Sequence, residues 1–269
     1  MQNYGVHLWD ALQKEGVYVT QINRLIRYIS ECDLGRTVYD AAFPVIIVAL
    51  LCYMWFHRKK YDIPLVKALA IVGILILATP RVSWLAAWIE YGFRAPEGGN
   101  VIRAFAFMPL VFLLTAKILR LPFALVVDFT APMMLIWNII GQSVCPFLGC
   151  CRGISCSWGI WNPLTDSILV PVQWMICLAG VAILVFLLWY EKKHLYCAQG
   201  KLYPILLVSW GGARFLLEYL RDNEKIIMGL SRYALYALFM VLVGMVWLFT
   251  IEEIQLENKR KSDQNNRKS

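Results

Sequence analysis

The chain has 269 residues, of which 59% are hydrophobic and only 16% are charged, and its formal net charge is +8 at pH 7. Soluble domains are typically ~45–50% apolar and ~25% charged, so this chain has too few polar side chains to cover a soluble core. The composition excludes a disordered chain, a coiled coil, a nucleic-acid-binding domain and an ordinary soluble enzyme. It predicts an all-α, polytopic integral membrane protein whose basic loops face anionic lipid.

Seven apolar stretches are each long enough to cross about 30 Å of hydrocarbon. They lie at residues 38–56, 63–79, 101–119, 122–144, 168–190, 202–220 and 233–251. The second stretch is expected to break at Pro80 and to continue as an amphipathic segment over residues 82–91. We therefore predict a transmembrane domain over residues 38–251, an N-terminal arm over residues 1–37 and a polar cytoplasmic tail without regular structure over residues 252–269.

The N-terminal arm carries an amphipathic pattern. Its apolar residues recur at roughly helical spacing at Val17, Val19, Ile22, Leu25, Ile26 and Ile29. We expect a helix that lies on the outer surface, either as a cap over the bundle or as an arm that contacts substrate. With the N-terminus outside, the inward segments hold thirteen Lys and Arg residues and the outward segments hold nine. This bias predicts an N-out, C-in orientation.

The sixth apolar stretch contains charged residues at membrane depth. An ionisable side chain there costs ~2.5–3.5 kcal/mol, so it needs a partner or a water-filled cavity. At ~100° per residue, the positions of Gly211, Arg214, Glu218 and Arg221 fall on one helix face. Arg214 and Glu218 can pair, which leaves Arg221 free to bind an anion such as a phosphate. The alternative is a structural ion-pair network that locks two helices together.

Three further ionisable residues interrupt other stretches. Arg81 follows Pro80, Arg103 lies in the third stretch and Asp128 lies in the fourth. If they converge on the sixth stretch, they form a strongly cationic cavity that attracts a lipid phosphate at the outer leaflet. Arg103 could instead extend to the outer interface, and Asp128 could instead form a salt bridge with one of the arginines.

A cysteine-rich segment, C-P-F-L-G-C-C-R-G-I-S-C, follows the fourth stretch over residues 145–156. Its spacing would be unusual for a four-thiolate zinc site, and Cys150-Cys151 could also be a redox pair or a thiol nucleophile. The favoured interpretation is structural disulfides or a tight Gly-Cys-Cys turn close to a ligand, bracketed by Gly149 and Gly153. No metal or cofactor is expected.

Residues 60–250 resemble the prolipoprotein diacylglyceryl transferase family of bacterial membrane enzymes. The clearest match is G-G-A-R-F-L-L-E-Y-L-R at residues 211–221, which is similar to the glycine, arginine, glutamate and arginine signature of the family. The segment G-Q-S-V-C-P-F-L-G-C-C-R-G occupies the place of the family's signature segment, in a Gly-Cys-Cys-x-Gly form. Other matching positions are Arg81, Asp128, Pro132, Gly141, Phe147, Gly149, Gly153, Pro171 and Gln173.

The chain also departs from the family pattern. Arg103 stands where the family usually has a histidine, and Gln142 stands where its signature segment has an arginine. Cys145 and Leu148 replace asparagines, and Ile176 replaces a glutamate. Because no histidine is placed to serve as a base, the substrate thiol would have to be activated by Glu218, by Asp128 or by a cationic field that lowers its pKa.

The resemblance implies a reaction in the bacterial cytoplasmic (inner) membrane. A phosphatidylglycerol-like phospholipid would donate its diacylglyceryl group to the thiol of a lipobox cysteine on a prolipoprotein, and glycerol phosphate would leave. The expected catalytic residues are Arg214, Glu218 and Arg103. The expected substrate-binding residues are Arg81, Asp128, Gly141, Gln142, Gly149, Cys150, Cys151, Gly153, Gln173, Gly211 and Arg221.

Two alternatives stay open. The chain could be a non-catalytic or repurposed relative that binds an anionic phospholipid or a membrane partner. It could also be a different transferase that uses Cys150 or Cys151 as a covalent acyl carrier. Neither a nucleic acid nor a cofactor is expected as a partner.

Overall fold

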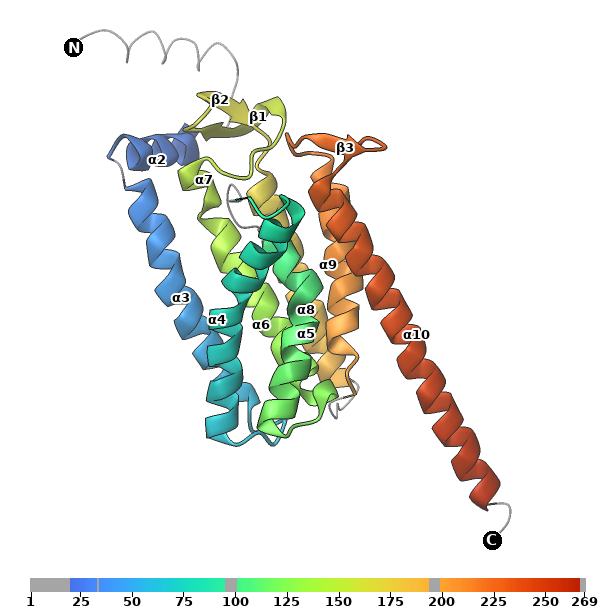
Figure 1. Ribbon diagram of the computed structural model, residues 1–269. Coiled ribbons are helices and arrows are strands. Elements are labelled where there is room, and N and C mark those ends of the chain that lie inside the picture. Colours follow the sequence, from blue (N-terminus) through green and yellow to red (C-terminus); the bar gives the residue numbers. More distant parts are fainter. Residues whose placement is uncertain (1–19, 33, 95–100, 194–198, 267–269) are drawn as a thin grey trace, which may run out of the picture.

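The chain folds into a bundle of long helices with two short hairpins at one end (Figure 1). The computed structural model describes residues 20–32, 34–94, 101–193 and 199–266. The helices are α2 (Thr20–Glu31), α3 (Gly35–His57), α4 (Leu65–Glu90), α5 (Val101–Leu119), α6 (Phe123–Ser143), α7 (Cys145–Leu148), α8 (Val172–Lys193), α9 (Leu202–Glu218) and α10 (Arg232–Asn266). The antiparallel hairpins pair β1 (Ser155–Asn162) with β2 (Ser167–Leu169) and β3 (Lys225–Ile227) with β4 (Leu230–Ser231).

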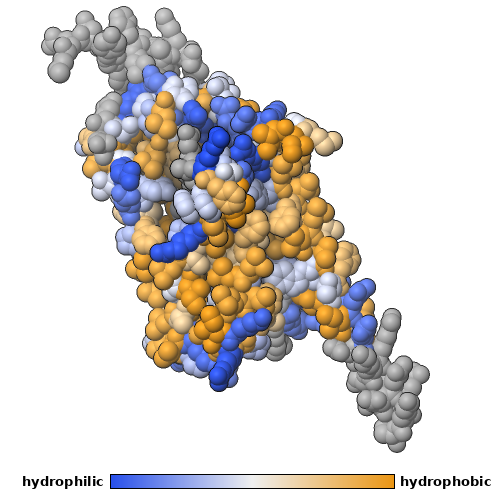
Figure 2. All heavy atoms as spheres, in the orientation of Figure 1, coloured by the Kyte–Doolittle hydropathy of each residue, from blue (hydrophilic) through white to orange (hydrophobic). Residues whose placement is uncertain are grey.

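Six of the described helices are long and apolar enough to cross a membrane, namely α3, α4, α5, α6, α8 and the Arg232–Glu257 part of α10. Hydrophobic residues cover most of the middle of the molecule, whereas hydrophilic residues gather toward its ends (Figure 2). The prediction of an all-α polytopic membrane protein is therefore confirmed. Helix α9 has 17 residues, or about 26 Å at 1.5 Å per residue. That α9 spans the membrane as a seventh helix stays a prediction.

Three element boundaries differ from those predicted. Pro80 does not break α4, which continues to Glu90, because tertiary contacts in a bundle can compensate for the hydrogen bond that a proline removes. Strand β2 occupies part of the fifth predicted stretch, so α8 begins only at Val172, directly after Pro171. Helix α10 extends to Asn266 instead of ending in an unstructured tail, since Glu, Gln and Lys favour helix once it has started.

The predicted amphipathic helix of the arm is α2, which lies across the end of the bundle next to α7 and β1 (Figure 1). The Asn23 side chain accepts a hydrogen bond of 2.9 Å from the backbone N–H of Trp161. The Arg27 guanidinium lies 4.9 Å from the centre of the Trp161 ring. These contacts favour the cap over the substrate-contacting arm. Residues 1–19 of the predicted arm lie outside the described residues.

The basic segments that were predicted to face inward lie at the end of the bundle opposite α2 (Figure 1). They lie at, or directly after, the C-terminal ends of α3, α5 and α8. The two ends of the bundle are thus divided as the charge pattern requires, and the N-out orientation itself stays a prediction.

Helices α9 and α10 pack closely along each other because glycines remove side chains at two points. A Cβ atom on Gly211 would lie 2.8 Å from the carbonyl oxygen of Ala237 in α10. A Cβ atom on Gly244 of α10 would lie 2.8 Å from the carbonyl oxygen of Pro204 in α9. Gly211 therefore faces the neighbouring helix, and its assignment to substrate binding stays a prediction that this packing does not support.

We expect Gly211→Ala to destabilise the protein by about 1–3 kcal/mol, since its methyl group would force α9 and α10 apart. Gly212→Ala is a matched control one residue away, because nothing lies within 4 Å of a Cβ atom there. That control should be neutral or stabilising by up to about 1 kcal/mol through its higher helix propensity. Thermal unfolding in detergent measures both. Equal melting temperatures for the two variants would contradict the tight packing.

Candidate functional site

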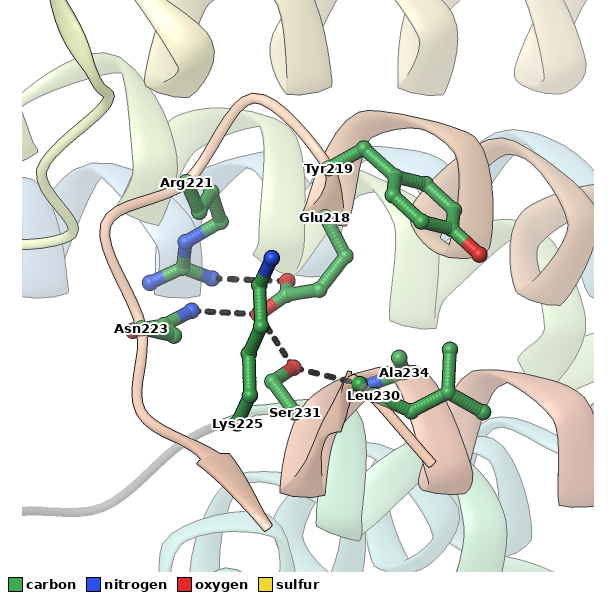
Figure 3. A pocket seen from close by; sticks show the side chains of 9 residues that line it. Glu218, Tyr219, Arg221, Asn223, Lys225, Leu230, Ser231 and Ala234 are labelled. Atoms are coloured by element: carbon green, nitrogen blue, oxygen red, sulfur yellow. Dashed lines mark hydrogen bonds and ion pairs between the residues drawn. The ribbon is translucent and has the colours of Figure 1, made fainter. Parts of the chain in front are cut away.

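A buried carboxylate, Glu218, lies at the end of α9 and collects donors from several segments (Figure 3). Its Oε2 lies 3.4 Å from Nη2 of Arg214 and 3.5 Å from Nη1 of Arg221. Its Oε1 accepts hydrogen bonds from the Ser231 hydroxyl at 2.8 Å and from the Asn223 amide. The structure therefore brings together the three charged residues predicted on this helix face. Arg221 was predicted to stay free, but it also pairs with Glu218.

A second buried ion pair lies beside the first. The Arg103 side chain is only 1% exposed, and its Nη2 and Nε lie 2.8 and 2.9 Å from Oε2 of Glu90, at the end of α4. The same carboxylate lies 3.4 Å from Nη1 of Arg232 and accepts a 3.3 Å hydrogen bond from Tyr236. Arg103 thus points into the protein and does not extend to the outer interface.

The ring of Tyr233, at the start of α10, connects the two ion pairs. The guanidinium carbon of Arg103 lies 5.6 Å from the ring centre, and that of Arg221 lies 5.5 Å from it. Both distances suit cation–π contacts. The joined cluster, which we call the arginine cluster, comprises Glu90, Arg103, Arg214, Glu218, Arg221, Arg232 and Tyr233. Its four guanidinium groups face two carboxylates, so it keeps an excess of positive charge.

The arginine cluster retains buried donors that could bind an anion. Nη1 of Arg214 and Nε of Arg221 have no hydrogen-bond partner among the described residues. Guanidinium N–H groups can only donate, so an anionic oxygen is their natural acceptor. An adjacent pocket is lined by Glu218, Tyr219, Arg221, Asn223, Lys225, Gly229, Leu230, Ser231 and Ala234 (Figure 3).

The cysteine-rich segment forms a tight turn against the first residues of α8. Gly149 has φ +68° and Cys151 has φ +57°, so the backbone adopts the left-handed conformation at both positions. The Gln173 amide donates a 2.6 Å hydrogen bond to the carbonyl of Cys150. The Asn162 amide donates a 2.9 Å hydrogen bond to the carbonyl of Gly149. The turn is therefore fixed by side chains from β1 and α8.

Backbone hydrogen bonds tie this turn to the end of α9. The N–H of Ile154 donates to the carbonyl of Leu220 at 3.0 Å, and the N–H of Asp222 donates to the carbonyl of Arg152 at 3.2 Å. A Cβ atom on Gly153 would lie 2.3 Å from the carbonyl oxygen of Val170. Gly153 is therefore closely packed and the turn is held next to the arginine cluster, while the role of Gly153 in substrate binding stays a prediction.

Three cysteines of the turn bring their sulfur atoms together. The Sγ atoms of Cys145, Cys150 and Cys151 all lie within 4.8 Å of one another. Hydrogen bonds among the three thiols, together with the guanidinium groups of Arg221 and Arg214, lower the pKa of the Cys151 thiol well below its ordinary value, although burial opposes this effect. The same hydrogen bonds, with burial, raise the pKa of the Cys145 thiol.

The predicted disulfides are absent, because every cysteine in the described part of the chain is free. The tight Gly-Cys-Cys turn, the other half of that interpretation, agrees with the structure. Cys156 lies apart from the three grouped sulfur atoms, on strand β1.

Two predicted site residues lie away from this region. Arg81 is exposed, and its guanidinium donates a 2.6 Å hydrogen bond to the carbonyl of Leu77 in its own helix. Both carboxylate oxygens of Asp128 accept backbone hydrogen bonds of 2.8 Å, from Gly200 and Leu202. Asp128 therefore fixes the start of α9, about 24 Å from Glu218 at 1.5 Å per residue. These contacts do not support a role for Asp128 or Arg81 at the site, and the substrate-binding role of both residues stays a prediction.

Gly141 and Gln142 lie at the end of α6, just before the turn. Nothing lies within 4 Å of a Cβ atom on Gly141. Oε1 of Gln142 and Oε1 of Gln173 are buried without a hydrogen-bond partner among the described residues. The two amide oxygens are therefore available as hydrogen-bond acceptors near the turn. The role of Gly141, Gln142 and Gln173 in substrate binding stays a prediction.

Sequence reasoning missed several members of the site, notably Glu90, Asn223, Ser231 and Tyr233. Glu90 is the last residue of an apolar span. An acidic residue at the end of a membrane helix usually faces water, so the sequence does not mark Glu90 as part of a site. Asn223 and Ser231 come from the loop and hairpin after α9. Only their shared contact with Glu218 marks them, and no spacing rule in the sequence predicts it.

Comparison with known sequences identifies the family. A sequence model described as prolipoprotein diacylglyceryl transferase matches residues 93–250, which is more than half of the chain. The chain belongs to the prolipoprotein diacylglyceryl transferase family. The match covers α5 to most of α10, and thus includes the cysteine turn and every member of the arginine cluster except Glu90.

Similar proteins carry the corresponding name. A phosphatidylglycerol–prolipoprotein diacylglyceryl transferase of Methylobacillus flagellatus is 31% identical over 232 residues, which are 81% of this chain and 77% of that protein. A second one, from Clostridium perfringens, is 27% identical over 136 residues, which are 48% of this chain and about half, 52%, of that relative. Relatives in Dehalococcoides mccartyi are 21% identical over 216 residues, which are 74% of this chain and 82% of those proteins.

Proposed function

We propose that this protein transfers the diacylglyceryl group of a phosphatidylglycerol-like phospholipid to the thiol of a lipobox cysteine on a prolipoprotein. The observation that carries the proposal is the arginine cluster, which keeps an excess of positive charge and buried N–H donors in a member of this family. The names of the similar proteins favour transfer over a role in binding alone. We place the protein in the bacterial cytoplasmic membrane, with the cluster toward the outer leaflet.

The arginines suit the leaving group of this reaction. Negative charge develops on the phosphate as the bond between carbon and oxygen breaks, and preorganised donors in a dry site stabilise that charge. Arg214 and Arg221 each hold a buried N–H group without a partner among the described residues, so we assign them to the phosphate. Arg103 adds a charge to the same field through Tyr233.

Glu218 is better suited to positioning than to proton transfer. Its two oxygen atoms face two guanidinium groups, one amide and one hydroxyl. These donors already occupy both carboxylate oxygens and hold the two guanidinium groups in place. We therefore assign Glu218 to orienting Arg214 and Arg221, which leaves the activation of the substrate thiol to another group.

A transfer assay tests the proposal directly. The purified protein is incubated in vesicles with labelled phosphatidylglycerol and a lipobox peptide, and the peptide is analysed by mass spectrometry. We expect a thioether-linked diacylglyceryl group on the cysteine peptide and none on a peptide with serine at that position. Lipid that binds to the protein without ever reaching the peptide would contradict the proposed activity.

A further inference from the structure

We infer that Cys145, Cys150 and Cys151 form a three-thiolate zinc site whose fourth position receives the thiol of the substrate cysteine. The inference rests on the proposed function and supplies the activating group that it lacks. A bound Zn²⁺ with three protein ligands and one open position is the usual arrangement of a catalytic zinc site.

The geometry of the three cysteines fits this ion. Their Sγ atoms all lie within 4.8 Å of one another. Sulfur atoms bound tetrahedrally to zinc at ~2.3 Å lie ~3.8 Å apart, so shifts of about 1 Å or less would close the site. Cys145 is buried, whereas Cys150 and Cys151 are partly exposed.

The turn is held in place independently of any metal. Two amide side chains, Gln173 and Asn162, fix the carbonyl groups of Cys150 and Gly149. The left-handed backbone at Cys151 is uncommon for a residue with a side chain. Such a conformation persists only where the surroundings impose it, and it is often found at functional sites.

The positive charge next to the cysteine turn also favours a zinc site with three thiolate ligands. Three thiolates and one Zn²⁺ carry a net charge of −1, which is costly to bury without a counterion. Backbone hydrogen bonds hold the turn against Leu220 and Asp222, the two neighbours of Arg221, and Arg214 shares the Glu218 carboxylate with Arg221. The two guanidinium groups would therefore stabilise both the anionic zinc–thiolate unit and the phosphate of the lipid.

A zinc ion bound by the three cysteines would activate the thiol of the substrate cysteine. A thiol that coordinates zinc is deprotonated outright, so no separate base is needed, and its proton is released to solvent. The coordinated sulfur attacks the glyceryl carbon that carries the phosphate ester. A carbon–sulfur bond forms, the carbon–oxygen bond breaks, and glycerol phosphate leaves with the electron pair. The product is a neutral thioether, which binds zinc weakly and is replaced by water.

The same chemistry argues against a covalent lipid intermediate on these cysteines. If Cys150 or Cys151 attacked the lipid itself, the diacylglyceryl group would be trapped in a stable thioether. No second transfer could then release it. Binding of a metal by the three thiolates leaves the nucleophile on the substrate, where the product must form.

Metal analysis of the full-length protein in detergent, purified without a histidine tag, tests the inference. We expect about one zinc per chain in the wild type, and loss of zinc in Cys145→Ser, Cys150→Ser and Cys151→Ser. Cys156→Ser is the matched control and should retain the metal, because its sulfur is not part of the group. Wild-type protein without zinc that also takes up none, zinc retained in the three variants, bound copper instead, or a disulfide among the three cysteines would each overturn the inference.

Cobalt substitution separates a catalytic site from a structural one. We expect a lipobox peptide with cysteine to strengthen the sulfur-to-cobalt charge-transfer absorption, and a serine peptide to leave it unchanged. Removal of zinc by a chelator should lower transfer about 100-fold, the scale of lost proton-transfer catalysis, and added zinc should restore it. Full transfer by metal-free protein would overturn the zinc site but not the proposed function. Zinc bound with a peptide-sensitive cobalt spectrum, but without transfer, would refute the proposed function alone.

Discussion

Arg214→Ala is expected to lower the rate of diacylglyceryl transfer about 100- to 1000-fold, the usual effect of removing one donor that stabilises a developing negative charge. Nη1 of Arg214 is buried without a partner in the described structure, so it is free to donate to the phosphate. Glu218 would still be neutralised by Arg221 and hydrogen-bonded by Ser231 and Asn223, so the variant should remain folded. The rate is measured by the appearance of lipidated peptide.

Arg81→Ala is the matched control for this prediction. Arg81 carries the same charge, but it is exposed and bonds only to its own helix in the described structure. We expect its transfer rate to stay within about twofold of the wild type, because exposed substitutions outside special features have small effects. If Arg214→Ala were as active as Arg81→Ala, the arginine cluster would have no part in the reaction.

Glu218→Gln is expected to have the largest effect on stability. The side chains of Arg214, Glu218 and Arg221 are only 3–4% exposed. Removal of the shared negative charge would leave two buried guanidinium groups facing each other without a counterion. Breaking a buried ion pair in this way costs about 3–5 kcal/mol. The change is measured by thermal unfolding in detergent, and the melting temperature should fall clearly.

Glu224→Gln is the control for this second prediction. Glu224 lies in the loop that follows α9, six residues after Glu218, and its side chain is exposed. Its substitution should alter the free energy of unfolding by no more than about 0.5 kcal/mol. A wild-type melting temperature for Glu218→Gln would show that the carboxylate is not needed to neutralise the arginines.

Apolar composition and the spacing of charged residues determined much of the architecture. The long hydrophobic runs are sufficient to predict membrane helices, because hydrocarbon requires helices of a given length and polarity. The helical period alone placed Arg214, Glu218 and Arg221 on one face, since helix geometry is local. The amphipathic arm was recognisable for the same reason.

The contact partners of the buried charged residues could not be predicted from these local patterns. Asp128 and Arg103 both looked like members of one cavity in the sequence. Asp128 accepts backbone hydrogen bonds at the far end of α9, whereas Arg103 pairs with Glu90, thirteen residues earlier in the chain. Both outcomes depend on how far along each helix the residue lies and on which way the helix runs. A hydropathy pattern does not contain that information.

The sequence by itself determined that this chain is a membrane helix bundle of the prolipoprotein diacylglyceryl transferase family with an arginine-rich sixth stretch, because composition, helical period and local motifs are written in consecutive residues. The tertiary structure alone decided that Tyr233 joins two ion pairs and that three cysteine sulfurs meet in a turn that is hydrogen-bonded to the residues flanking Arg221. Those contacts arise where loops and helix ends from distant segments pack together. Their energies depend on burial and distance, which only the folded chain fixes.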